Sequence, residues 1–362
     1  MSRPPLLPLR TLALLALAAT APVRPASAAY CVHDVHELRE ALIEAAGSSL
    51  PLEFVRVREG HYLIEQGGAL GLYLLQGGKT IEVSGGWTGA GGACSQRVLG
   101  ASRTVIESAT LNRVLDVNMV QGVSGNVIVL QDLTLRNPRG WYDGAACLDM
   151  TSVAGNQIAL ERLRFDDCRS TSTDVLHASA LHIGGNGPVA VRNIAVTGGR
   201  GPGAAVSIGV HGGTVARIGQ LTITGHDVTS STPVVGGLWL AAVGSSDRIH
   251  LSNSVIARNT GAPAPSLLLG GEPVTVSLAR VHYESLSGLP LANVAPGTGD
   301  PGFVAPGEGG LRPDSILVDS GVAAPEGGTG IRDVDGRFRV LGAAVDVGAI
   351  EYDDVLFRDG FD

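Results

Sequence analysis

The sequence has few of the side chains that make charged or aromatic binding surfaces. Lys79 is the only lysine among 362 residues, aromatic residues make up 4% of the chain, and charged residues make up 17%. The formal net charge is −8, from 26 basic and 34 acidic side chains. A chain with this charge and a single lysine offers no basic patch to a phosphate backbone, so the composition predicts no nucleic-acid partner.

The sequence also lacks an apolar run as long as the roughly 20 residues of a membrane-spanning helix. A short apolar stretch at residues 11–19 follows Arg3 and Arg10, and the triplet Ala26-Ser27-Ala28 comes after it. This order is typical of a secretory signal, which we place at residues 1–28. Its removal takes away three arginines and no acidic residue, leaving 23 basic and 34 acidic side chains and a charge of −11. We therefore expect an exported protein without an integral membrane segment.

Cysteine is scarce as well, with four in the chain. In an exported protein four cysteines favour disulfides, for which three connectivities exist. We favour Cys31–Cys94, which would tie the N-terminal cap to an early turn, and Cys147–Cys168 within the repeats. Free buried thiols are the alternative. No Cys or His spacing of a zinc site is present, and the sequence predicts no metal and no other cofactor.

Glycine, by contrast, contributes 51 residues without a three-residue period, which favours many short strands and turns. Six segments spaced by 27 to 33 residues share an apolar frame around a polar midpoint. The midpoints are Asp132, Arg162, Asn193, Gln220, Asn253 and Arg280. Apolar residues alternate on both sides of each midpoint, which predicts a strand, a bend and another strand. Five positions later stand residue types that tolerate a left-handed backbone, namely Asn137, Asp167, Gly198 and Gly225, with Asn259 one position late. A tight corner and a second strand are expected there.

A repeat of about 30 residues built from short strands cannot bury its own apolar face, so successive repeats must stack. We therefore predict an all-β fold, a right-handed parallel β-helix (a solenoid), over residues 101–290. A propeller is less suitable, because its blades run to about 40–50 residues. The prediction requires Leu133, Leu163, Ile194 and Leu221 to lie in single file.

Both ends of a solenoid need protection. At residues 29–100 we expect an N-terminal capping helix and irregular first coils. Asp34 and Glu37 have the spacing of a capping box, and Gly47 ends the helical pattern. After about residue 290 the repeat is lost, which leaves a closing segment at 291–352 and a short tail at 353–362.

Several stretches resemble secreted right-handed parallel β-helix repeat proteins of the pectate-lyase-like superfold. GDPGFV, LRPDSILVDSG, DVDGRFR and VDVGAIEY are similar to the closing segment known as choice-of-anchor Q. GGW, CSQR and RTVIE look like the opening coils of such proteins, and DVLFRDGFD resembles a tail seen on exported proteins. The resemblance implies the architecture and export. It implies no single activity, because this fold hosts lyases, hydrolases and adhesins.

The predicted stacking places Asp149, His182, Ser207, Trp239 and Leu268 at one outward position on consecutive coils. An Asp, a His and a Ser in this order suggest a triad with His182 as base and Ser207 as nucleophile. The simpler interpretation is that outward positions are polar because they face water. A saccharide-binding strip with Trp239 as a stacking ring is a further hypothesis.

A second candidate pairs Asp143 with Asp174, which occupy similar loop positions on adjacent coils. Two carboxylates about 5–5.5 Å apart would suit a retaining glycosidase, and turn formation is the alternative. Trp141 and Tyr142 beside Asp143 would supply a sugar platform or simply cover a turn.

Two further motifs are incomplete. Asp333, Asp335 and Gly336 lack the downstream ligand of a calcium loop, and we expect a turn there. Asp166, Asp167 and Cys168 resemble a polygalacturonase motif, but the Asn-Thr-Asp sequence that precedes it in that family is missing.

From these patterns we expect an exported monomer that binds a polysaccharide or another cell-surface polymer without catalysis. The alternative is a polysaccharide lyase or glycoside hydrolase acting on an acidic or neutral polysaccharide.

Overall fold

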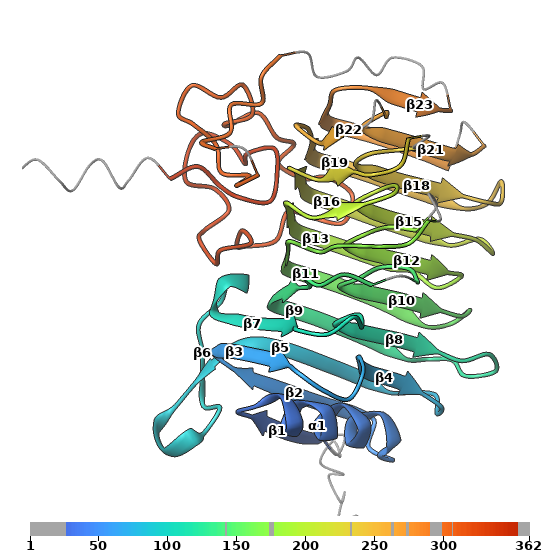
Figure 1. Ribbon diagram of the computed structural model, residues 1–362, viewed down its shortest axis with the longest axis vertical. Coiled ribbons are helices and arrows are strands. Elements are labelled where there is room, and N and C mark those ends of the chain that lie inside the picture. The colour runs from blue at the N-terminus through green and yellow to red at the C-terminus, as the bar shows by residue number, and fades with distance from the viewer. Residues whose placement is uncertain are drawn as a thin grey trace, which may run out of the picture.

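The computed structural model describes residues 27–141, 143–173, 177–231, 234–261, 264–272, 275–289, 299–305 and 307–353. Two large sheets and one small sheet wind into a parallel β-solenoid, as predicted (Figure 1). Sheet A contains β1 (Ser27–Val32), β2 (Leu52–Arg58), β3 (Gly60–Ile64), β5 (Thr80–Thr88), β6 (Gln96–Arg97), β7 (Thr104–Ser108), β9 (Val127–Arg136), β11 (Gln157–Asp166), β13 (Val189–Thr197), β16 (Val215–Thr224), β19 (Arg248–Ile256) and β22 (Val276–Tyr283).

Sheet B contains β4 (Leu70–Leu74), β8 (Leu115–Met119), β10 (Leu148–Ser152), β12 (Leu181–Gly185), β15 (Val206–Val210), β18 (Leu238–Ala242), β21 (Leu267–Gly271) and β23 (Leu286–Gly288). A small third sheet contains β14 (Arg200–Gly201), β17 (Asp227–Val228) and β20 (Thr260–Gly261). The helical elements are α1 (Val35–Gly47) and two short 3₁₀ turns, η1 (Ala90–Gly92) and η2 (Ala101–Arg103).

The core is a stack of apolar side chains from successive coils. Leu163 pairs with Leu133 on one side and with Ile194 on the other, and Ile194 pairs with Leu221. All four are at most 1% exposed, so the predicted single file is confirmed. The inward residues of sheet B, such as Leu148 and Leu181, belong to the same core.

Each long strand of sheet A bends at its polar midpoint. All six midpoint residues have a left-handed backbone, with φ between 46° and 57°. This conformation reverses the alternation of inward and outward side chains, which is why the apolar pattern shifts by one position at each midpoint. The sequence predicted the bend but not its left-handed backbone. Residues such as Arg162 and Gln220 rarely adopt this conformation.

The corner after each bend differs in detail from the prediction. Asp167, Gly198 and Gly225 are left-handed as expected. In the fifth repeat the left-handed residue is Arg258 (φ 55°), and Asn259 instead accepts a hydrogen bond from the His226 backbone N–H. Asn137 keeps a negative φ and uses its side chain to hold the Ala146 carbonyl.

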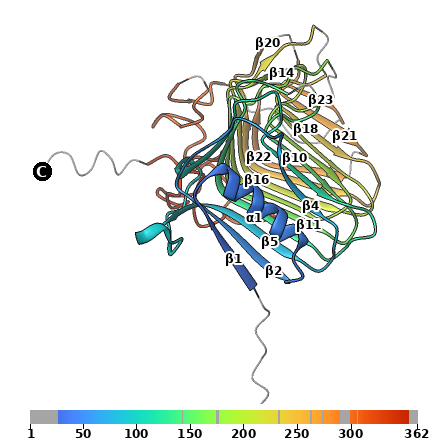
Figure 2. The ribbon, with the colours of Figure 1, turned by 60° about the horizontal axis from the view of Figure 1, so that its bottom comes forward.

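Helix α1 covers the N-terminal end of the solenoid (Figure 2). Asp34 caps the helix by accepting a hydrogen bond from the Glu37 N–H at 2.8 Å. Leu38 and Leu42 lie on the buried face of the helix. Lys79, the single lysine, lies at its other end and is 3% exposed. Its ammonium donates to the carbonyls of Ala45, Ala46 and Ser48, so it closes the helix C-terminus.

Both predicted disulfides are present. Cys31 of β1 is bonded to Cys94, and Cys147 is bonded to Cys168. The first holds the N-terminal strand to the loop after η1, and the second joins two corners of one coil.

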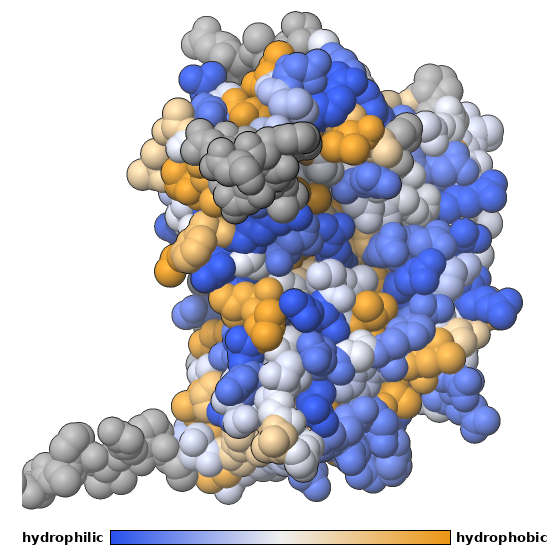
Figure 3. All heavy atoms as spheres, turned by 90° about the vertical axis from the view of Figure 1, so that its left-hand side faces the viewer, coloured by the Kyte–Doolittle hydropathy of each residue, from blue (hydrophilic) through white to orange (hydrophobic). Residues whose placement is uncertain are grey.

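Residues 299–305 and 307–353, here called the strap, lie along the outer side of sheet A, and sheet B lies on the opposite side (Figures 1 and 2). The strap contacts the bends: Val322 N–H donates to Asn253 Oδ1 at 2.7 Å, and Ala349 N–H donates to Thr222 Oγ1 at 2.8 Å. On this face apolar side chains form separate patches between hydrophilic ones (Figure 3).

Candidate functional site

Sheet B carries the predicted row of outward residues on adjacent strands. The register pairs Asp149 with His182, His182 with Ser207, and Ser207 with Trp239. Leu268 follows Trp239 on β21. Because neighbouring strands lie about 4.8 Å apart, these residues form one continuous line, here called the sheet B row.

The row begins one strand earlier than the sequence indicated, at Asp116 of β8, which pairs with Asp149. Arg113 bridges the two carboxylates: its Nη1 lies 2.8 Å from Asp149 Oδ2 and 3.3 Å from Asp116 Oδ1. The Tyr73 hydroxyl donates to Asp116 Oδ2 at 2.9 Å. Sequence reasoning missed Arg113, Asp116 and Tyr73 because their coils precede the six aligned repeats.

His182 lies flat on the sheet next to this cluster. A Cβ at position 184 would come within 3.2 Å of its Nε2, so the ring depends on the glycine at that position. Burial lowers the pKa of His182, and the Asp149 carboxylate only partly opposes the shift. The imidazole is therefore neutral at pH 7.

The three residues of the triad hypothesis are adjacent, but they are not linked as a triad. Asp149 pairs with Arg113, and no hydrogen bond in the described part of the chain joins His182 to Asp149 or Ser207. Ser207 is 4% exposed. A nucleophile needs a base within hydrogen-bonding reach and access to its substrate, and Ser207 has neither here.

The loop before β10 contacts the same cluster. Arg113 Nη2 donates to the Asp143 carbonyl at 2.7 Å, and its guanidinium lies 5.6 Å from the centre of the Trp141 ring. The Trp141 indole N–H also donates to the Asp143 carbonyl. Trp141 therefore stands beside the acidic end of the row. Tyr142 and Asp174 lie outside the described residues, so the Asp143–Asp174 pairing stays a prediction.

Trp239 stands near the opposite end of the row, one strand before Leu268, and is half-buried. A Cβ at position 270 would be 3.7 Å from its Nε1, so the indole reaches over the neighbouring strand. Three strand spacings separate β10 from β18, about 14 Å. The two tryptophans thus mark the two ends of one face and do not form a single stacking platform.

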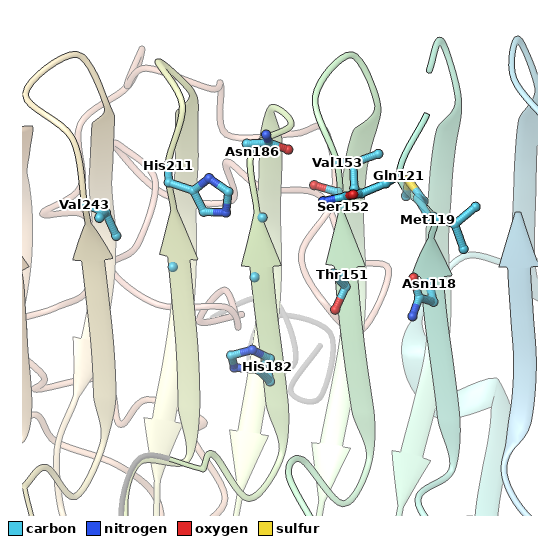
Figure 4. Close-up of a pocket in the computed structure, with 14 residues that line it drawn as sticks. Asn118, Met119, Gln121, Thr151, Ser152, Val153, His182, Asn186, His211 and Val243 are labelled. Atoms are coloured by element: carbon cyan, nitrogen blue, oxygen red, sulfur yellow. The ribbon is translucent and has the colours of Figure 1, made fainter. Parts of the chain in front are cut away.

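A cavity of about 710 Å³ opens next to the row at the carboxyl ends of five strands, β8 to β18 (Figure 4). Asn118, Thr151 and His182 line it from the strands, while Gln121, Asn186, His211 and Val243 line it from the turns that follow. His182 belongs to both the row and the cavity. Sequence reasoning missed this cavity, because it identified only one of the two outward positions on each strand.

The acidic motifs noted in the sequence are used in local structure. Asp333 Oδ1 accepts from the backbone N–H groups of Asp335 and Arg337, and Asp335 pairs with Arg164 at 2.7 Å. Asp167 pairs with Arg169 at 2.8 Å. No group of three or more His, Cys, Asp or Glu side chains within the described ranges is arranged to hold a metal ion.

Comparison with known proteins adds no family: no protein-family model, no curated protein and no solved structure matches the chain. The fold defines the chain as a parallel β-solenoid protein with two disulfides. None of the helices that the structure describes has the length and apolar character needed to cross a bilayer. The resemblance to choice-of-anchor proteins stays a prediction from sequence motifs.

Proposed function

We propose that this protein is an exported module that binds a polysaccharide or another surface polymer on the outward face of sheet B, without catalysis. One observation carries the proposal: the sheet B row and the 710 Å³ cavity share His182, which makes one elongated face with polar and apolar groups across several strands. Aromatic rings near both ends of the row would contact sugar rings by stacking.

The arrangement of the charged groups supports binding over catalysis. Asp149 and Asp116 are both engaged as ion-pair partners of Arg113, which gives the two carboxylates a structural role on this face. The strap lies on the opposite side of the molecule and leaves this face free of the described chain. The signal-like segment and the two disulfides favour an exported location.

A polysaccharide lyase or glycoside hydrolase is the second candidate, favoured by the two adjacent carboxylates. Because both contact Arg113 Nη1, the contacting oxygens of Asp116 and Asp149 lie within about 6 Å of each other, close to the separation used by retaining glycosidases.

The proposal is tested by incubating the mature protein with a panel of acidic and neutral polysaccharides. Retention in affinity electrophoresis and release of products are measured on the same samples. We expect retention by at least one polysaccharide without product release. Trp239→Ala should weaken retention about fivefold, since a lost stacking contact costs about 1 kcal/mol.

Phe338→Ala is the matched control, because Phe338 is an exposed aromatic residue on the strap, away from sheet B. Product release that is abolished by Asp149→Asn would support the enzyme and contradict the binding proposal. Failure to retain any polysaccharide of the panel would contradict both.

A further inference from the structure

The floor of the cavity beside the sheet B row is bare backbone. Gly184 of β12 and Gly209 of β15 occupy the position where β8 and β10 carry Asn118 and Thr151. A Cβ added at Gly209 would meet no atom within 4 Å, so this position opens onto free space. A flat ligand can therefore approach the strands directly at this point. The volume of about 710 Å³ lies within the range of small-ligand sites, about 300–1,000 Å³.

Most of the surface exposed in the cavity is apolar, and polar groups stand at its rim. The rim presents the amides of Asn118, Gln121 and Asn186 and the hydroxyl of Thr151, with His182 and His211 between them. Asp, Glu, Lys and Arg are all missing from the lining residues. Amides and hydroxyls act both as donors and as acceptors, which matches the hydroxyl groups of a sugar. Val153 and Val243 add apolar surface at the edge.

The nearest charges disfavour an acidic ligand. Asp116 and Asp149 stand two residues before Asn118 and Thr151 on the same strands, which is about 7 Å along the backbone. This distance is shorter than the screening length of about 8–10 Å at physiological salt, so their charge reaches the cavity. Arg113 compensates only one of the two carboxylates. A uronate ring in the cavity would face net negative charge and no cationic partner among the lining residues.

We propose that this cavity is the specificity pocket of the binding face and that it accepts an uncharged, polyhydroxylated sugar unit of a neutral glycan. The inference rests on the proposed polysaccharide-binding function and narrows its substrate class. Asn118, Thr151 and Asn186 make the hydrogen bonds to hydroxyl groups, and the glycine floor gives the ring close access to the sheet. The sheet B row then continues the contact along the chain toward Trp239.

The test measures binding of soluble probes to the mature protein by calorimetry: cellohexaose, xylohexaose and mannohexaose as neutral probes, and hexagalacturonate as the acidic one. We expect at least one neutral hexaose to bind, and hexagalacturonate to bind at least tenfold more weakly. Gly209→Leu fills the floor and should weaken neutral binding at least tenfold, whereas Gly209→Ser at the same position should change it less than threefold.

Asn118→Leu is the alternative variant if Gly209→Leu does not fold. It keeps the approximate size of the side chain, removes the amide, and should weaken neutral binding at least fivefold. Ala159→Leu, at an outward position of sheet A, is the control for a bulky addition elsewhere. Preference for hexagalacturonate would overturn the neutral-glycan inference while leaving polymer binding intact. If Gly209→Leu and Asn118→Leu both leave neutral binding unchanged, the cavity is not the binding pocket. No binding of any probe would overturn both the inference and the proposed function.

Discussion

At the scale of single residues, His226 connects three loops inside the molecule. It has no exposed surface; its Nε2 lies 3.0 Å from the Gly203 carbonyl and its Nδ1 lies 3.3 Å from Ser179 Oγ. The Nε2–H tautomer satisfies both contacts, because Nε2 then donates and Nδ1 accepts. Burial lowers the pKa of His226 to about 4. The loops that lead into β12, β15 and β17 are thus joined by a neutral imidazole.

This histidine predicts a loss of stability in acid. The folded-state pKa lies below the unfolded value of about 6.5, so its contribution is complete above pH 6.5 and is lost as the pH falls toward 4. The expected loss by pH 4 is about 3 kcal/mol. His226→Gln removes the titrating group, and the difference between wild type and variant in urea unfolding from pH 7 to pH 4 measures the effect. His36→Gln, at an exposed position of α1, should behave as the wild type. Parallel curves for wild type and His226→Gln would contradict the assignment.

At the scale of elements, α1 is held at both ends by side chains that contact its backbone. The Asp34 carboxylate accepts from the first turn, and the Lys79 ammonium donates to carbonyls at the last turn. Charges of these signs also complement the helix dipole. Burial lowers the pKa of Lys79, and the nearby Glu53 carboxylate partly opposes this shift. Glu53 is itself fully buried and accepts a hydrogen bond from the Ser48 hydroxyl.

Lys79→Met should therefore lower the free energy of unfolding by about 2–3 kcal/mol, because it leaves the carbonyls at the helix C-terminus without their donor and removes the positive charge near the buried Glu53 carboxylate. Guanidinium unfolding followed by circular dichroism measures the change. Arg103→Met removes an exposed pair with Glu59 and should change stability by less than about 0.5 kcal/mol. Equal stability of the two variants would show that Lys79 does not support the helix.

The strands could be predicted from the sequence because their apolar pattern repeats and each coil constrains the next. The bends show where such reasoning ends. Asn193 and Asn253 suit a left-handed backbone, but Arg162 and Arg280 do not, and stacking imposes the same conformation on all of them. The row from Asp149 to Trp239 followed from the repeat, whereas Arg113 and Asp116 lie in a coil without that frame. The cavity depends on which strands carry glycine at the register position of Thr151. The sequence alone does not give this register, because it has to be read from the stacked coils.

At the scale of the whole molecule, the strap ties distant coils together. Arg339 is 2% exposed; its Nη1 pairs with Glu351 at 2.8 Å, and its Nη2 donates to Asn193 Oδ1 at 2.6 Å. In η2, which packs beside β9 and β11, the Ala101 N–H donates to the Val334 carbonyl at 2.9 Å. A solenoid coil otherwise contacts only its neighbours, so the strap adds the long-range links that such a fold lacks.

Arg339→Met should release the strap while the solenoid stays folded, because Glu351, Asn193 Oδ1 and the Gly348 carbonyl lose a buried donor, at a cost of about 1–3 kcal/mol. Hydrogen exchange should become faster in residues 307–353 and stay slow in the strands of sheet B. Arg312→Met, which removes exposed ion pairs to Asp300 and Asp314, is the control. Uniformly faster exchange in every strand would contradict a separate opening of the strap.

The burial of Lys79 also decides how the protein can be attached to a surface. The sequence contains no other lysine, and this one is 3% exposed with its ammonium fully engaged. If the predicted signal segment 1–28 is removed, amine-reactive coupling under native conditions will act on the α-amino group of Ala29, which lies in β1. Because strand β1 lies at the α1 end of the solenoid, molecules coupled in this way will share one orientation, with the outward face of sheet B accessible from the side.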